Sequence, residues 1–272
     1  MQRILLPTDF SDNSFHAAQY AAQLLGTAHV EWTLLHTYLD ADPSVSSWAG
    51  MAEELFKAAM QGMEQWEQRI RKTDLFADAK VATQVVYGPL PAVLDDLAGQ
   101  KGADLVVMGT QGRSGAGILG SNAAAVVKNS HCPVLVVPAK ARLGSPGKIL
   151  FADDQRGVEV EGTRMLLHIA LRAKAEVVLA HVLRSKDELP DAELVAMYNE
   201  LLQAIPHRFI SEEGKDVAGV IDFLARKEHA GMIAVLHRHT GFFEGLFRPS
   251  TAKRLALHTD IPLLVLQDHD RK

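Results

Sequence analysis

The sequence predicts an α/β protein of two similar domains, each built around a parallel β-sheet. Three observations support this fold class. Short apolar runs of strand length alternate with amphipathic segments of helix length, which is typical of successive βαβ units. The length of 272 residues suits two domains of about 100–150 residues each. The pattern of the first half also recurs in the second half.

Five strands are expected in the first half. Residues 4–6, 105–108 and 134–137 are apolar at every position, so helices are expected to cover both faces of these strands. Such strands lie in the centre of a sheet rather than at its edge. The predicted strands are 3–7, 30–37, 81–87, 104–109 and 133–138.

The first helix is expected at residues 12–25. Ser11 can accept a hydrogen bond from the first turn as the N-cap, and Gly26 suits the end of the helix. Phe10 and Phe15 stand at the two positions of a hydrophobic staple. These signals define both ends of the helix.

The second half repeats the first at a constant offset. A shift of 145 residues aligns Asp9 with Asp154 and His36 with His181. Near the carboxyl ends of the two copies the shift is 129, so the second copy is shorter in its middle. The missing residues are expected to correspond to segment 38–73.

Segment 38–73 is expected to hold a loop and a long helix that contains Trp48, Phe56 and Trp66. The second copy has room only for a short helix near residues 191–204. The middle of the repeat is therefore where the two copies differ most.

Residues 139–147 are expected to link the copies, because they include Gly144-Ser145-Pro146-Gly147 and such turn-forming residues cannot continue a strand. The boundary is predicted near residue 143. The two domains are then residues 1–143 and 144–272.

The composition narrows the class of protein. The chain has 28 Lys and Arg against 33 Asp and Glu, a formal net charge of -5, and no basic run that could neutralise a row of phosphates. Nucleic acid is therefore not an expected partner.

Cys132 is the only cysteine, which excludes an intramolecular disulfide and a multi-cysteine zinc site. With no signal-peptide pattern and no run near the roughly 20 apolar residues that span a bilayer, we expect a cytoplasmic protein with no membrane partner.

Five blocks of the first half match a known pattern in their order and spacing. They are Ile4-Leu5-Leu6-Pro7-Thr8-Asp9-Phe10-Ser11, Leu35-His36, residues 104–112, Gly120-Ser121 and residues 131–137. Together they resemble the universal stress protein family, over nearly the whole chain and twice, with the second copy weaker. The resemblance implies two Rossmann-like domains, each a five-stranded parallel sheet with helices on both faces. It also implies a family in which a subset of members bind ATP or AMP, and membership alone does not imply an enzyme.

The resemblance further implies how the two halves associate. Homodimers of the family pair through the last strand, so strand 133–138 is expected beside strand 261–266. Both runs are apolar and would leave an unprotected sheet edge if unpaired. We therefore expect an intrachain pseudo-dimer of the two domains, and a further homodimer or an unknown protein partner remains open.

A glycine-rich loop after the fourth strand is the expected nucleotide site. Nucleotide-binding members carry Gly-x2-Gly-x9-Gly-Ser/Thr, whereas here Gly109 and Gly112 are followed by only seven residues before Gly120-Ser121. Glycines allow backbone N–H groups to approach an anion, and Ser121 would open a helix with its positive end toward it. The candidate nucleotide-binding residues are Pro7, Asp9, His36, Gly109, Gly112, Gly115, Gly120, Ser121 and Asn122.

The same loop also fits other motifs. Residues 115–120 spell GxGxxG, but they begin several residues after the strand and no acid follows about 20 residues on to hold a ribose. The spacing of a Walker A motif is present too, yet Ser121 stands where the lysine is required. A plain surface loop is the alternative that remains open.

The second half lacks the glycines of this loop. Leu236, His239 and Pro249 stand at the three glycine positions, and only Ser250 is kept. These side chains do not readily adopt the backbone shapes that glycine adopts. The same stretch offers an apolar surface, so this copy is expected to be structural or regulatory. The apolar residues are Phe242, Phe243 and Phe247.

Several candidate residues also have an ordinary structural interpretation. Asp9 suits a turn as well as an adenosine contact, and the recurrence of His36 as His181 favours a shared packing role. His237-Arg238-His239 is a weak metal signal, and a solvated loop is the preferred interpretation. Ser121 has no base in a recognisable local motif, which argues against nucleophilic catalysis.

Two functions remain. The leading one is a nucleotide-sensing module that binds ATP or AMP, with or without Mg²⁺, in the N-terminal domain only. The alternative is a ligand-free interaction or scaffold protein of the same family. An ATPase is poorly supported, because no motif places a cation or acid around a γ-phosphate and Arg113 is the only cation in the loop. We therefore do not expect an enzyme.

Overall fold

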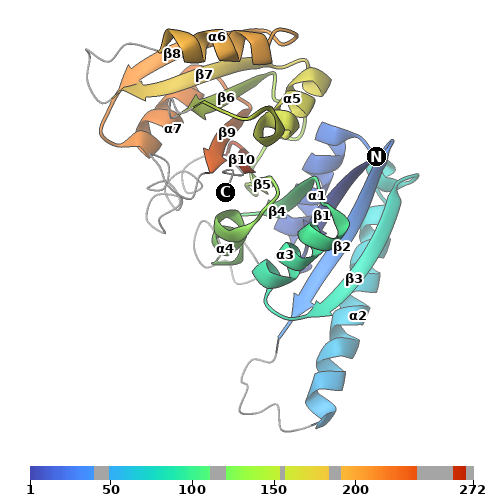
Figure 1. Ribbon diagram of the computed structural model, residues 1–272. Coiled ribbons are helices and arrows are strands. Elements are labelled where there is room, and N and C mark those ends of the chain that lie inside the picture. Colours follow the sequence, from blue (N-terminus) through green and yellow to red (C-terminus); the bar gives the residue numbers. More distant parts are fainter. Residues whose placement is uncertain (40–48, 111–120, 154–156, 184–190, 238–259, 268–272) are drawn as a thin grey trace.

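Figure 1 shows a computed structural model of the chain, which describes residues 1–39, 49–110, 121–153, 157–183, 191–237 and 260–267. Strands and helices alternate through both halves, as the sequence predicts. The first half contains β1 (Gln2–Pro7), α1 (Asp12–Leu25), β2 (Val30–Tyr38), α2 (Ala49–Arg71), the 3-10 helix η1 (Asp74–Phe76), β3 (Lys80–Tyr87), α3 (Leu90–Lys101), β4 (Leu105–Gly109), α4 (Ser121–Asn129) and β5 (Val134–Val137). The second half contains β6 (Lys148–Asp153), α5 (Val160–Ala173), β7 (Glu176–Leu183), α6 (Ala192–Leu201), β8 (His207–Glu213), α7 (Val217–Lys227), β9 (Met232–His237) and β10 (Leu263–Gln267).

The strands in the described part of the chain all belong to one ten-stranded sheet of order β3-β2-β1-β4-β5-β10-β9-β6-β7-β8. Within each half the five strands are parallel, and the halves join through β5 and β10, which pair antiparallel with Leu135 opposite Leu264. The predicted pairing of these two strands is therefore present. From either edge inward, the strands of each half follow the same order: the third, second, first, fourth and fifth strand of that half. The two halves are therefore arranged as a pseudo-dimer.

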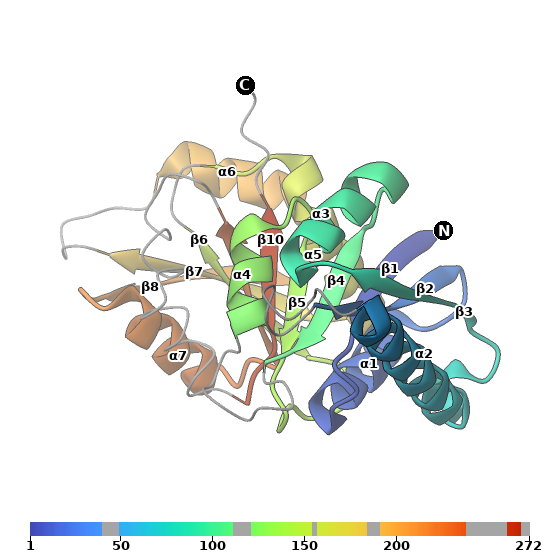
Figure 2. The same cartoon turned by 90° about the horizontal axis from the view of Figure 1, so that it is seen from below.

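Helices cover both faces of this sheet and enclose two cores (Figure 2). One core lies between the sheet and helices α1, α2, α5 and α6, and the other between the sheet and helices α3, α4 and α7. Apolar side chains of the central strands alternate between the two cores, as expected for strands buried on both faces. The α/β fold with helices on both faces is confirmed.

Helix α1 begins and ends where its capping residues predict. The Ser11 hydroxyl accepts a hydrogen bond from the Ser14 N–H at 3.2 Å, which satisfies one donor of the first turn. Gly26 ends the helix at φ 68°, and its N–H donates to the Ala22 carbonyl. The residue before the cap, Phe10, also has a positive φ of 64°.

The middle of the repeat differs between the halves as expected. Helix α2 has 23 residues and α6 has 10. On α2, Trp66 is buried and Phe56 is 42% exposed, while Trp48 lies outside the described residues. In the second half the shorter α6 borders a cavity beside β7 and β8.

The two halves also meet beside the sheet. Helix α1 packs against α5 across the seam. The linker contributes as well, because His16 of α1 donates from Nε2 to the Ala141 carbonyl oxygen at 2.9 Å. None of the described helices is long and apolar enough to cross a bilayer.

Candidate functional site

The candidate site lies at the carboxyl ends of β1, β2 and β4, the edge of a parallel sheet where ligands of open α/β folds bind. Pro7 is the last residue of β1 and is buried. After it, the Thr8 N–H donates to the Leu35 carbonyl at 2.8 Å, and His36 donates from Nδ1 to the Thr8 carbonyl at 2.7 Å. The loop between β1 and α1 is thus anchored to β2.

Hydroxyl groups fix the shape of this loop. The Ser14 hydroxyl donates to the Ser11 carbonyl at 2.8 Å, so the Thr8 hydroxyl is the donor in its 2.9 Å contact with Ser14 Oγ. Thr8 Oγ1 also accepts from the Phe10 N–H at 2.9 Å. These bonds hold Phe10 in its left-handed conformation, and its ring stacks on His36 with centroids 4.2 Å apart.

Asp9 is a half-exposed residue on this loop. Its Oδ1 accepts from the Ser11 N–H at 3.1 Å, which is the turn that its sequence context suggests. The carboxylate therefore has a structural role here. A role toward adenosine stays a prediction.

Gly109 ends β4 beside the first turn of α1. A Cβ at this position would lie 2.5 Å from Asn13 Nδ2 and 3.2 Å from the Asn13 carbonyl carbon, so a side chain here would have to displace Asn13. The glycine therefore permits close packing within the protein. Sequence reasoning missed Asn13, because nothing local links it to a strand that ends almost a hundred residues later.

Most of the predicted phosphate loop lies outside the described residues, including Gly112, Gly115 and Gly120. Ser121 is the first residue of α4, as predicted, and Asn122 follows it as an exposed residue. The structure thus brings Pro7, Asp9, His36 and Gly109 to one sheet edge, and their role as nucleotide ligands stays a prediction.

In the second half the end of β9 is packed, and one expectation made there is wrong. His237 was expected in a solvated loop, but it is the last residue of β9 and is 6% exposed. Its Nδ1 lies 3.0 Å from the Gln267 Oε1 of β10, the residue opposite it in register. The Gln267 amide oxygen gives the imidazole a hydrogen-bond partner, so His237 can be buried at the end of the strand.

The neighbouring Leu236 is buried at 3% exposure and pairs with Leu266. A leucine therefore fills space where the family motif has its first glycine. The remaining members of the second loop lie outside the described residues, and they are His239, Phe242, Phe243, Phe247, Pro249 and Ser250. Within the described part of the chain, no three His, Cys, Asp or Glu side chains are grouped to hold a metal ion.

Comparison with known proteins identifies the family. The model of the universal stress protein family matches residues 1–138 and again residues 146–267. A universal stress protein of Methanocaldococcus jannaschii is 34% identical over 141 residues, which cover 50% of this chain and 81% of the relative. Universal stress protein G of Salmonella typhimurium is 29% identical over 148 residues, covering 49% of this chain and 96% of the relative.

A solved structure extends the likeness to both halves together. The crystal structure of a universal stress protein from Archaeoglobus fulgidus covers 99% of this chain and 97% of its own, with a TM-score of 0.75 and 20% identity, and so shares the fold. The family model matches each half separately, and the two halves share one sheet order. The chain therefore belongs to the universal stress protein family, with two copies of the family domain in tandem.

Proposed function

We propose that this protein is a nucleotide-responsive binding module that holds one adenine nucleotide, ATP or AMP, in its first half. The observation that carries the proposal is the difference between the ends of two equivalent strands. In the first half β4 ends at Gly109 and leads into a loop rich in glycine, whereas in the second half Leu236 of β9 is packed into the core. Backbone can approach a phosphate closely only where side chains are absent.

The described residues suit the adenosine end of such a ligand. Asp9 is half exposed, and hydrogen bonds between its loop and β2 hold its backbone in place. A carboxylate fixed in this way can accept hydrogen bonds from ribose hydroxyls. The phosphates would then lie toward the start of α4, where backbone N–H groups and the helix dipole favour negative charge.

We propose a binding role and not catalysis. The loop from Gly109 to Ser121 contains a single cation, Arg113, and lacks the lysine of a P-loop. Any Mg²⁺ would be bound largely through the phosphate oxygens of ATP, as is common for this ion. The loop is also two residues shorter than the family motif. The contacts that this shortening would remove first are those to the terminal phosphate.

Calorimetric titration of the full chain with AMP, ADP and ATP tests the proposal. We expect one site per chain, with AMP and ATP within about tenfold of each other. Asp9→Asn should weaken binding at least tenfold, because the amide cannot offer a charged acceptor to ribose, while its oxygen still accepts from the Ser11 N–H and keeps the turn.

The matched control is Asp154→Asn, the same change 145 residues later in the half without the glycines. It should leave the affinity unchanged. Two sites per chain would contradict the asymmetry. No heat with any of the three nucleotides at millimolar concentration would favour the ligand-free interaction protein instead.

A further inference from the structure

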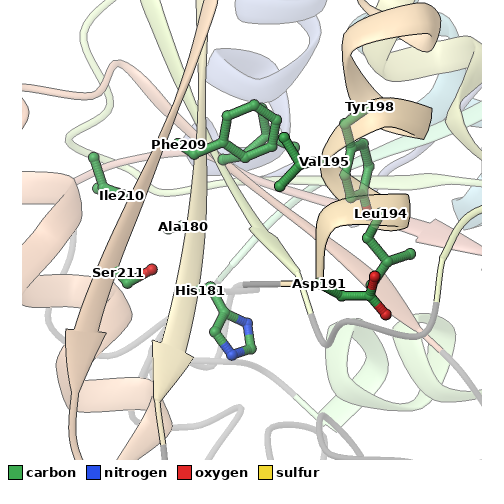
Figure 3. A pocket seen from close by; sticks show the side chains of 10 residues that line it. Ala180, His181, Asp191, Leu194, Val195, Tyr198, Phe209, Ile210 and Ser211 are labelled. Carbon is green, nitrogen blue, oxygen red and sulfur yellow. The ribbon is translucent and has the colours of Figure 1, made fainter. Parts of the chain in front are cut away.

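A cavity opens in the second half between α6 and the strands β7 and β8 (Figure 3). Its empty space, counted together with the solvent at its open mouth, is about 370 Å³. Most of its wall is apolar. The lining residues are Leu179, Ala180, His181, Asp191, Leu194, Val195, Tyr198, Phe209, Ile210 and Ser211.

The sheet register explains how this wall is built. Leu179 lies opposite Phe209, and His181 lies opposite Ser211. Alternate residues of a strand point to the same face, so these four side chains face α6 together. In Figure 3 the two aromatic rings, from Tyr198 and Phe209, lie toward one end of the cavity, and His181, Ser211 and Asp191 lie toward the other.

The first half has an aromatic ring at the equivalent place. The offset of 145 aligns Leu34 with Leu179 and His36 with His181. On His36 the ring of Phe10 is stacked at 4.2 Å, and it reaches so close to α2 that a Cβ on Gly62 would lie 2.6 Å from Phe10 Cε2. The space between this strand and its helix is therefore filled by the protein's own ring.

In the second half the residue at the position of Phe10 is not aromatic. The counterpart of Phe10 at the same offset is Gln155, which lies outside the described residues. Phe209 on the cavity wall is 38% exposed and lies on β8, the strand at one edge of the sheet. Aromatic side chains in the wall of a concave, mainly apolar site are the surfaces that small molecules cover when they bind.

We propose that this cavity binds a small, neutral, planar aromatic molecule that carries one hydrogen-bond donor, of the class of indole or phenol. Its ring would lie over His181 as the ring of Phe10 lies over His36. Asp191 favours a donor over an anion at the polar end, because its carboxylate stands there as the N-cap of α6, accepting from the Glu193 N–H at 2.8 Å. Ser211 adds a hydroxyl at the same end.

This site is independent of the proposed nucleotide site. It lies in the half without the glycine loop, and it is lined by side chains from β7, β8 and α6. A nucleotide bound near Asp9 would not compete with it. A result that contradicts one of the two proposals would therefore leave the other unaffected.

Saturation-transfer NMR of the full chain with indole is the direct test, with benzoate as the anionic comparison. We expect saturable binding of indole, binding of benzoate at least fivefold weaker, and no displacement of indole by AMP. Val195→Trp would place an indole ring into the cavity from α6 and should weaken indole binding at least tenfold. The matched control is Ala196→Trp, which adds the same ring at the exposed neighbouring position of the same helix and should change nothing.

Circular dichroism would show whether Val195→Trp still folds. If it does not, Ser211→Ala tests the proposal instead, because it removes only the hydroxyl at the polar end. This variant should weaken indole binding two- to fivefold. The proposal is overturned if indole shows no saturable binding up to its solubility limit, if a folded Val195→Trp binds it as well as the unaltered chain, or if AMP displaces it. Tighter binding of benzoate than of indole would overturn the proposed ligand class.

Discussion

Arg172 of the second half caps a helix of the first half. Its Nε donates to the carbonyl oxygen of Leu24, in the last turn of α1, at 3.0 Å. The last carbonyls of a helix have no partner within the helix, and a cation there also complements the helix dipole. Gly26 passes beside this guanidinium at φ 68°, and a Cβ on it would overlap the Arg172 side chain. The seam between the halves therefore depends on a glycine as well as on the shared sheet.

Gly26→Ala should destabilise the protein by about 2 kcal/mol, because alanine is strained at a positive φ and its Cβ would displace Arg172. Urea unfolding followed by circular dichroism measures this. Gly99→Ala is the control, since a Cβ within α3 at that position meets no atom within 4 Å and should stabilise the chain by about 0.5–1 kcal/mol. Equal stabilities of the Gly26→Ala chain and the unaltered chain would show that the seam tolerates the side chain.

Glu228→Gln should lower the free energy of unfolding by about 1 kcal/mol at pH 7. A hydrogen bond from Arg208 holds the pKa of Glu228 below its usual value, and Lys148 lies 3.7 Å from the same carboxylate. A carboxyl whose pKa is lowered by folding stabilises the protein above its unfolded pKa, about 4.5, and this contribution is lost as the pH falls through the folded value.

The difference between the unaltered chain and Glu228→Gln should therefore shrink as the pH falls below about 4.5, and urea unfolding from pH 7 to pH 3 would record it. Glu213→Gln serves as the control, because Glu213 is an exposed residue at the end of β8. It should show little effect at any pH. If Glu228→Gln lowered the free energy of unfolding equally at every pH, the glutamate would stabilise the protein through packing and not through its charge.

Residues 1–143 expressed alone should form dimers or aggregates. In the full chain β5 pairs with β10, and without β10 the apolar edge of β5 would be open. Size-exclusion chromatography with light scattering at several concentrations measures the mass. A soluble monomer across that range would contradict this role of β5.

Phe10→Gly should create a second indole site. It removes the ring that is stacked on His36, and glycine adopts the φ of 64° without strain. Saturation-transfer titration should then report two indole molecules per chain. Phe15→Ala is the control, since the Phe15 ring lies 3.9 Å below the Arg69 guanidinium and should leave the count at one. One site in both variants would argue that the two halves are not equivalent in this region.

The limits of α1 were predictable because Ser11 and Gly26 act within one turn of the helix. The pairing of β5 with β10 joins distant residues, and it was predictable because two apolar runs matched a family resemblance. The contacts that sequence reasoning missed also join distant residues, and no local pattern or resemblance marks them. His237 was misplaced because Gln267, thirty residues later, satisfies it, and the fit of Gly109 against Asn13 follows only from how β4 meets α1. The cavity beside α6 likewise forms only where α6, β7 and β8 come together in the fold.

Because β5 and β10 belong to one chain, their junction forms at a local concentration that the linker sets, and dilution does not separate the two halves. In a symmetric homodimer every substitution occurs twice and alters both equivalent sites at once. Here a change in one half leaves the other untouched, so Gly109 and Leu236 can stand at equivalent strand ends of one molecule. Covalent linkage thus lets the two family domains diverge in chemistry while they keep a fixed one-to-one ratio.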